Sequence, residues 1–158
     1  MLQVVGISDM KTSANGEDVL VTYSLGSCVG VALYDPVARI GGMVHCMLPT
    51  SKSDPEKAQA NPYMFTDTGV AVLLQEIYNM GARRDRIVAK VAGASNLLDD
   101  KGLFKIGERN YTVLRKILWK NEILIKSEDV GGTKARTLYL HIADGTTLVK
   151  SAGQEVIL

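Results

Sequence analysis

Residues 19–48 read VLVTYSLGSCVGVALYDPVARIGGMVHCML and contain three apolar, β-branched runs separated by short turn signals. These runs predict strands at 19–24, 29–34 and 40–48, because branched and aromatic residues favour strands and Asp-Pro favours a turn. A further strand is expected at 3–7, ahead of the turn-rich Ser-Ala-Asn-Gly at 13–16. The first third of the chain is therefore predicted to be β-structure.

Further along, the apolar residues recur at helical spacing. One helix is expected after Asp67, which can cap its start, and Gly81 is suited to its end. A second helix is expected at 107–120. The other predicted elements are strands at 87–92, 123–130, 137–142 and 147–150, with a polar loop at 99–102 and an exposed loop at 51–62.

Strands first, followed by helices interspersed with strands, predict an α+β fold. We expect mixed, largely antiparallel β-sheets flanked by two main helices. A chain of 158 residues can bury a core of its own. Because no linker, repeat or low-complexity tract interrupts the pattern, we expect residues 1–158 to form a single domain.

Composition narrows the classes of partner. Eighteen basic residues against 17 acidic ones give a net charge of +1, and no basic run is interleaved with aromatics, so a nucleic-acid partner is not expected. No apolar run approaches the roughly 18 residues of a membrane span, and no signal peptide is evident. Two cysteines in a chain of this length predict no disulfide framework. We expect a cytoplasmic protein with protein or small-molecule partners that is not embedded in a membrane.

Cys28 lies in a glycine-flanked turn, and His45 follows 17 residues later. A thiol attacks as the thiolate, so a neighbouring imidazole is a suitable base. Gly26 allows close backbone approach, and amide N–H groups at Ser27 and Cys28 can converge as an oxyanion hole. The alternative is that Cys28 is a buried, unreactive hydrophobe, which is the common fate of cysteine.

Strand periodicity distinguishes the two cysteines. If His45 points towards Cys28, then Cys46 points to the opposite face of its strand together with Val44 and Leu48. Adjacent residues of one strand do not converge easily on a tetrahedral ion. No metal site is therefore expected, and the proposed chemistry needs no cofactor.

The preceding strand offers a hydroxyl that can orient the imidazole. Thr22 and Ser24 are expected to share one face of that strand. Threonine is also a common strand residue that does no more than pack, and the residues alone favour this alternative for Thr22.

Ordered blocks of residues make the chain resemble the CheD family of chemoreceptor glutamine deamidases over nearly its full length. They are TYSLGSCV at 22–29, DP at 35–36, GGMVHCMLP at 41–49, Tyr63 with Asp67, MGA at 80–82, AK at 89–90, GA at 93–94, IGERN at 106–110, DVGG at 129–132 and Arg136. The family's usual loop differs from AGASNL at 92–97, which contains no expected catalytic residue.

The resemblance implies that Cys28, His45 and Thr22 are the catalytic cysteine, histidine and threonine. It implies an α/β sandwich similar to the deamidase domain of cytotoxic necrotizing factor toxins. It implies chemoreceptor cytoplasmic domains as the substrate, with glutamine hydrolysed to glutamate through a cysteine thioester. It also implies a CheC-type phosphatase of CheY as a partner. Two alternatives stay open: a binding module that regulates such a phosphatase, and the same thiol chemistry used for transglutamination or peptide cleavage.

Other polar residues are interpreted structurally. His141 is expected to be a surface or satisfied core histidine, and Asp129 a turn residue before Gly131-Gly132. Arg109 and Arg136 are expected to be solvated, although either one offers a charge for an acidic receptor segment. Trp119 is expected to be either a core residue or part of a contact surface.

Overall fold

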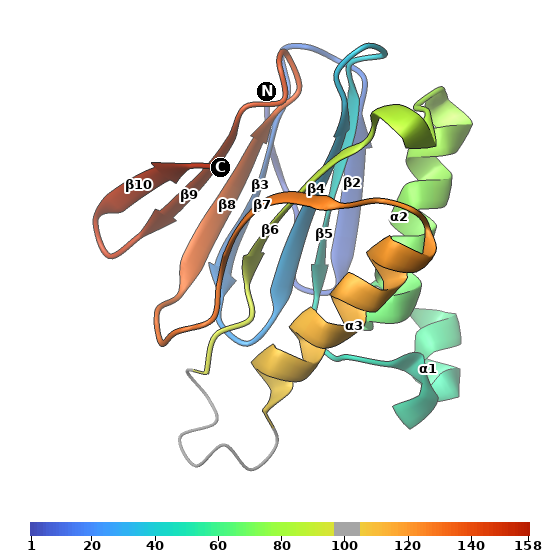
Figure 1. The fold of residues 1–158 in the computed structure, drawn as a ribbon, viewed down its shortest axis with the longest axis vertical. Helices are drawn as coiled ribbons and strands as arrows, with labels where there is room; N and C mark the ends of the chain where they lie inside the picture. Colours follow the sequence, from blue (N-terminus) through green and yellow to red (C-terminus); the bar gives the residue numbers. More distant parts are fainter. Residues whose placement is uncertain (97–104) are drawn as a thin grey trace.

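The computed structural model describes residues 1–96 and 105–158. Two five-stranded sheets lie face to face, and the main helices cover the outer face of one of them (Figure 1). The first sheet has the order β1 (Leu2–Val4), β3 (Val19–Leu25), β8 (Arg136–His141), β9 (Thr147–Ser151), β10 (Gln154–Ile157). The second has the order β2 (Asp9–Ser13), β5 (Ile40–Cys46), β4 (Val29–Asp35), β6 (Val88–Gly93), β7 (Ile125–Val130).

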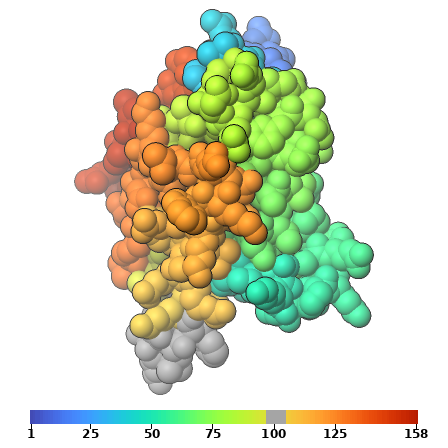
Figure 2. Space-filling view, turned by 45° about the vertical axis from the view of Figure 1, so that its right-hand side comes forward, coloured from blue at the N-terminus to red at the C-terminus, as the bar shows by residue number. Residues whose placement is uncertain are grey.

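The helices are α1 (Pro55–Ala60), α2 (Thr66–Met80) and α3 (Ile106–Lys120), with single 3₁₀ turns at Ser51–Ser53, Pro62–Met64 and Arg84–Arg86. Helices α2 and α3 pack together against the second sheet, and Figure 2 shows them side by side on the face turned to the viewer. No helix in the described part of the chain combines the length and apolarity that crossing a membrane requires.

The second sheet is buried on both faces because strand residues alternate between two cores. From β4, Val31 and Leu33 point to the helices, whereas Ala32 and Tyr34 point to the first sheet. This explains why every residue of β4 and β5 is buried. The side chains that face the first sheet are therefore held between two layers of strands.

The predicted α+β class is confirmed. Within the described residues, six strand pairs are antiparallel and two, β1 with β3 and β6 with β7, are parallel. The hairpin around Asp144-Gly145 joins β8 to β9, and both main helices begin within one residue of the expected positions. Gly81 ends α2 with a left-handed φ of 118°, as expected for a C-terminal glycine.

Asp67 does not cap α2 as predicted. The N-cap is Phe65, and no side chain among the described residues caps the helix. The Asp67 carboxylate instead accepts hydrogen bonds from the backbone N–H and the hydroxyl of Ser51, at 2.9 Å each. It therefore ties the start of α2 to the segment that follows β5.

Three short elements were not predicted. β2 reads DMKTS and has little apolar character, and every residue of β10 is exposed, so neither shows the usual strand pattern. Helix α1 lies within the predicted loop at 51–62, where Asp54 caps it and Pro55 occupies its first turn. The polar loop expected at 99–102 lies outside the described residues.

Candidate active site

Thr22 and His45 come from different sheets and meet between them. Thr22 lies on β3 and His45 on β5, and neither side chain is exposed to solvent. The Thr22 Oγ1 atom is 2.7 Å from His45 Nδ1 and also 2.7 Å from the carbonyl oxygen of Val5. The packing of the two sheets thus creates the pair.

These two contacts determine the tautomer of His45. The hydroxyl has one proton, and the Val5 carbonyl can only accept, so Thr22 donates to Val5. The hydroxyl oxygen then accepts from Nδ1–H, which leaves the lone pair on Nε2. Nε2 is buried and has no hydrogen-bond partner among the described residues.

His45 is neutral at physiological pH. Burial lowers the pKa of its imidazole from 6.5 to about 4, because an imidazolium would lose its hydration. A neutral ring with a free Nε2 is a proton acceptor. The arrangement suits a general base more than the positive half of a preformed ion pair.

Cys28 lies in the turn between β3 and β4 and is half-buried. Its side chain packs against the core between the two sheets, the core that His45 also faces. In the register of β4 with β5, His45 pairs with Gly30, two residues beyond Cys28. Cys28, in the turn just before β4, thus lies two residues along the chain from the residue that pairs with His45.

Burial favours the protonated form of the Cys28 thiol. Desolvation raises its pKa above the usual range, and its own backbone N–H opposes that rise only in part. No hydrogen bond joins it to His45, since Nε2 has no partner in residues 1–96 and 105–158. The candidate dyad thus rests as a neutral thiol and a neutral imidazole.

The Cys28 turn is fixed by the end of β6. The Ala94 N–H donates to the Cys28 carbonyl at 2.8 Å, and the Ser95 N–H donates to the Gly26 carbonyl at 2.9 Å. This close approach requires Gly93, whose φ is 106° and whose position would place a Cβ atom 2.3 Å from the Cys28 oxygen. Gly26 and Ser27, the other predicted site residues, are half-buried in the same turn.

Cys46 points to the opposite face of β5 from His45, as strand periodicity predicts. It is fully buried in the core beneath the helices, where a Cβ atom at Gly69 of α2 would lie 2.8 Å from its sulfur. Burial raises the pKa of this thiol strongly. No group of three metal-binding side chains gathers within the described ranges.

The prediction that Thr22 and Ser24 share a face is wrong. A bulge interrupts β3 between Thr22 and Leu25, and Ser24 adopts a left-handed φ of 58°. Thr22 is therefore buried, whereas Ser24 is exposed. The bulge also bends the chain into the Cys28 turn.

Two buried side chains that sequence reasoning did not place at the site support the turn. Asn110 of α3 donates to the Ser27 carbonyl at 2.9 Å. Arg136, expected to be solvated, is only 3% exposed and donates to the Gly93 carbonyl at 3.1 Å. Its guanidinium also pairs with Asp129, which is why a charge is tolerated there. Both residues occur in the blocks shared with the family, but their positions depend on contacts distant in sequence.

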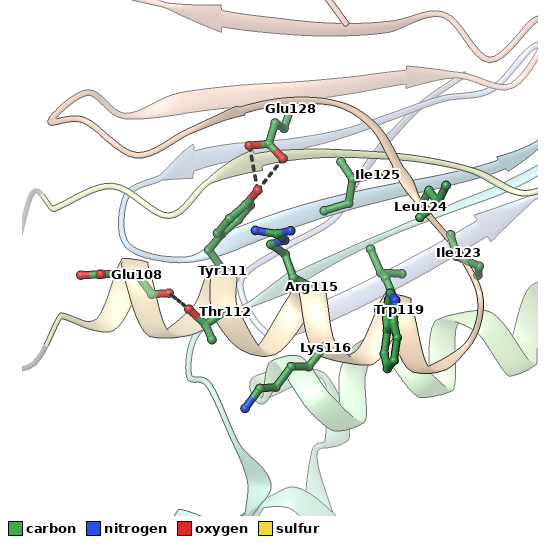
Figure 3. Close-up of a pocket in the computed structure, with 11 residues that line it drawn as sticks. Glu108, Tyr111, Thr112, Arg115, Lys116, Trp119, Ile123, Leu124, Ile125 and Glu128 are labelled. Atoms are coloured by element: carbon green, nitrogen blue, oxygen red, sulfur yellow. Dashed lines mark hydrogen bonds between the residues drawn. The ribbon is translucent and has the colours of Figure 1, made fainter.

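The remaining candidates lie elsewhere. His141 is half-buried at the end of β8, Arg109 is exposed on α3, and Trp119 is 77% exposed. Trp119 and Leu124 border a groove of about 860 Å³ between α3 and β7 (Figure 3). Neither Thr22, Cys28 nor His45 lines this groove, so it is separate from the candidate site.

The comparisons with known proteins agree on one family. Its sequence model, described as CheD chemotactic sensory transduction, matches residues 47–151. A "Probable chemoreceptor glutamine deamidase CheD" of Solibacter usitatus is 47% identical over 96% of this chain and 90% of its own length. The "Probable chemoreceptor glutamine deamidase CheD 1" of Syntrophus aciditrophicus is also 47% identical, over 95% of this chain and 94% of its own length.

Among solved structures, the hypothetical protein YfiH of Bacillus licheniformis has a TM-score of 0.48 and 15% identity, covering 77% of this chain and 49% of its own. That similarity is too low to support an argument. The sequence matches are decisive because they span almost the whole chain at high identity. The chain belongs to the CheD family.

Proposed function

We propose that this protein is a chemoreceptor glutamine deamidase that uses Cys28 as its nucleophile. The observation that carries the proposal is the Thr22–His45 hydrogen bond. It leaves Nε2 buried and, among the described residues, without a hydrogen-bond partner, on the side of β5 that faces the core against which Cys28 packs. Relatives with 47% identity are named as probable deamidases of chemoreceptor glutamines. The geometry of the site and the names of its relatives both support glutamine deamidation.

In the first half of the reaction, His45 Nε2 takes the proton from the Cys28 thiol as its sulfur attacks the glutamine side-chain carbonyl. The carbonyl oxygen becomes an oxyanion, which the Cys28 backbone N–H stabilises. His45 then returns the proton to the nitrogen, the C–N bond breaks, and ammonia leaves. A thioester between Cys28 and the substrate remains.

In the second half, His45 takes a proton from water, whose oxygen attacks the thioester carbonyl. The C–S bond breaks, the proton returns to sulfur, and glutamate is released. Thr22 holds the imidazole with its proton on Nδ1 throughout, so that Nε2 is available in both halves. No group outside the chain other than water takes part in these steps.

The product is a carboxylate in place of a neutral amide on the receptor's cytoplasmic domain. We therefore place the protein in the cytoplasm, where that domain is accessible. A CheC-type phosphatase that binds the face around Cys28 would compete with the receptor for this site.

Mass spectrometry of a receptor cytoplasmic fragment tests the proposal. Wild-type protein should add about 1 Da at a glutamine, and about 3 Da in water labelled with oxygen-18, because the new oxygen comes from the solvent. Cys28→Ala should add nothing, whereas the matched variant Cys46→Ala should retain activity if it folds. An unchanged fragment with wild type, or the same gain with Cys28→Ala, would contradict the proposal. Incorporation of an added primary amine would indicate transglutamination instead.

A further inference from the structure

Asn110 is a fully buried amide whose two N–H protons both have partners. Its Nδ2 donates to the Ser27 carbonyl at 2.9 Å and to the Met47 carbonyl at 3.0 Å. Its Oδ1 lies 3.3 Å from the hydroxyl of Thr66. The orientation of the amide is chemically determined, because two carbonyls can face only the nitrogen.

The two carbonyls belong to the two halves of the candidate dyad. Ser27 immediately precedes Cys28, and Met47 follows His45 by two residues. One side chain of α3 therefore connects the turn of the nucleophile to the end of the strand that carries the base. The contacts span 83 and 63 residues of sequence, so they lie outside any local turn chemistry.

The hydrogen bond to Ser27 has a consequence for the next amide. In a trans peptide the C=O and N–H groups point in opposite directions, and no described peptide bond is cis. Because the Ser27 carbonyl points to Asn110, the Cys28 N–H points away from α3. In the described part of the chain this N–H interacts with its own sulfur and donates to no backbone carbonyl.

We propose that Asn110 is a positioning residue for acyl transfer: by holding the Ser27 carbonyl, it turns the Cys28 N–H towards the developing oxyanion. The inference rests on the proposed cysteine chemistry and extends it to a residue that does not touch the substrate. Removing the amide would let the Ser27–Cys28 peptide rotate, and the oxyanion would lose an aligned donor.

Two small reagents separate positioning from general damage. Iodoacetamide alkylates the thiol by displacing iodide, with no oxyanion. With p-nitrophenyl acetate, the sulfur attacks the ester carbonyl, an oxyanion forms, p-nitrophenolate leaves and His45 takes the thiol proton. Asn110→Ala should lower the rate of acylation at Cys28 by about 10²-fold. Its alkylation rate should stay within about threefold of wild type, with the same pH dependence.

Asn110→Asp keeps the shape of the side chain and removes both N–H donors, to Ser27 and to Met47, so it decides the question if Asn110→Ala does not fold. It should show the same selective loss of acylation. Asn121→Ala is the matched control, because Asn121 donates from the other end of α3 to the Ile117 carbonyl at 2.7 Å and has no contact with the Cys28 turn. Its acylation rate should equal that of wild type.

The inference is overturned if folded Asn110 variants acylate within about threefold of wild type, or lose alkylation and acylation equally. It is also overturned if Asn121→Ala shows the same loss, or if wild-type Cys28 is not acylated at all. A wild type that is acylated but deamidates no receptor glutamine overturns the proposed function alone. The two failures are therefore distinguishable.

Discussion

Thr22 contributes one hydroxyl, and that hydroxyl determines which nitrogen of His45 carries the proton. In Thr22→Val, neither the Nδ1–H nor the Val5 carbonyl keeps its partner. The ring is then free to place its proton on Nε2, where it cannot accept from the thiol. We expect kcat for deamidation to fall by about 10²-fold with KM little changed.

Thr22→Ser is the control for that change, because serine keeps the hydroxyl and loses only a methyl group. Deamidation assays of both variants, with thermal unfolding measured in parallel, check the expectation. Similar activity losses in Thr22→Ser and Thr22→Val would show that packing, not the hydroxyl, is what matters.

The buried imidazole of His45 also makes stability depend on pH. Its pKa is 6.5 when exposed and about 4 when folded, so between these values the unfolded chain binds a proton that the folded chain does not. The contribution of His45 to stability is therefore fully present above about pH 6.5 and is lost as the pH falls towards 4. This group alone should lower the free energy of unfolding by about 2 kcal/mol between pH 7 and pH 5.

Urea unfolding at several pH values measures this pH dependence of the free energy of unfolding. His45→Gln should lose that part of the pH dependence, because glutamine does not titrate. His141→Gln, which removes the chain's other imidazole, should retain it. The explanation fails if His45→Gln keeps the full wild-type dependence.

At this scale, residue patterns predicted part of what the structure shows around the candidate site. Strand periodicity predicted that Cys46 points away from the face of His45, because the side-chain period of a strand is fixed by its backbone, and Cys46 does lie in the core beneath the helices. In β3 the same alternation failed, because Ser24 adopts a left-handed φ. The site role of Thr22 came from family resemblance, because a lone threonine in a strand indicates nothing by itself.

Among the elements, β6 ends directly against the Cys28 turn. An added Cβ at Gly93 would clash with the Cys28 carbonyl and interfere with its hydrogen bond from Ala94. Gly93→Ala should therefore displace the turn and lower kcat by about 10²-fold, the typical loss for a 1 Å misplacement. Deamidation kinetics and thermal unfolding check this outcome.

Gly153→Ala provides the matched control for backbone strain. Gly153 also has a positive φ, 78°, but an added Cβ there would meet no atom of residues 1–96 or 105–158 within 4 Å. It should cost about 1–2 kcal/mol of stability and no activity. An equal loss of activity in both variants would mean that strain, and not the contact with Cys28, lowers the rate.

Element types were predictable where a long periodic pattern exists, as in α2 and α3. Contacts between elements were not. Asn110 occupies a buried helix position that sequence alone does not distinguish from an ordinary polar residue, and its partners lie in the Cys28 turn and just beyond β5. Arg136 was expected in solvent because arginine usually is, yet its carbonyl and carboxylate partners satisfy it in the interior.

At the scale of the whole molecule, the candidate site depends on how two sheets pack. Thr22 belongs to one sheet and His45 to the other, so their 2.7 Å contact exists only at the native separation. At some glycines of the second sheet, an added Cβ would press on side chains of the first sheet. At Gly30, which pairs with His45, an added Cβ would lie 2.8 Å from Leu25 and 3.1 Å from Leu138.

Gly30→Ala should therefore push the sheets apart beside the dyad. Overpacking of this kind typically costs about 1–3 kcal/mol of stability. The displacement should also lengthen the Thr22–His45 contact, and we expect kcat to fall by about tenfold or more.

Gly41→Ala is the matched control, because it creates similar overpacking away from the site. Its added Cβ would lie 2.9 Å from Tyr34 and 3.0 Å from Ile142. Gly41 is four residues from His45 along β5, about 13 Å in an extended strand. It should lose comparable stability and keep its activity, as measured by urea unfolding and deamidation rates. If both variants lose activity in proportion to stability, the site depends only on global folding. If Gly30→Ala alone loses activity, the separation of the sheets at His45 controls the reaction.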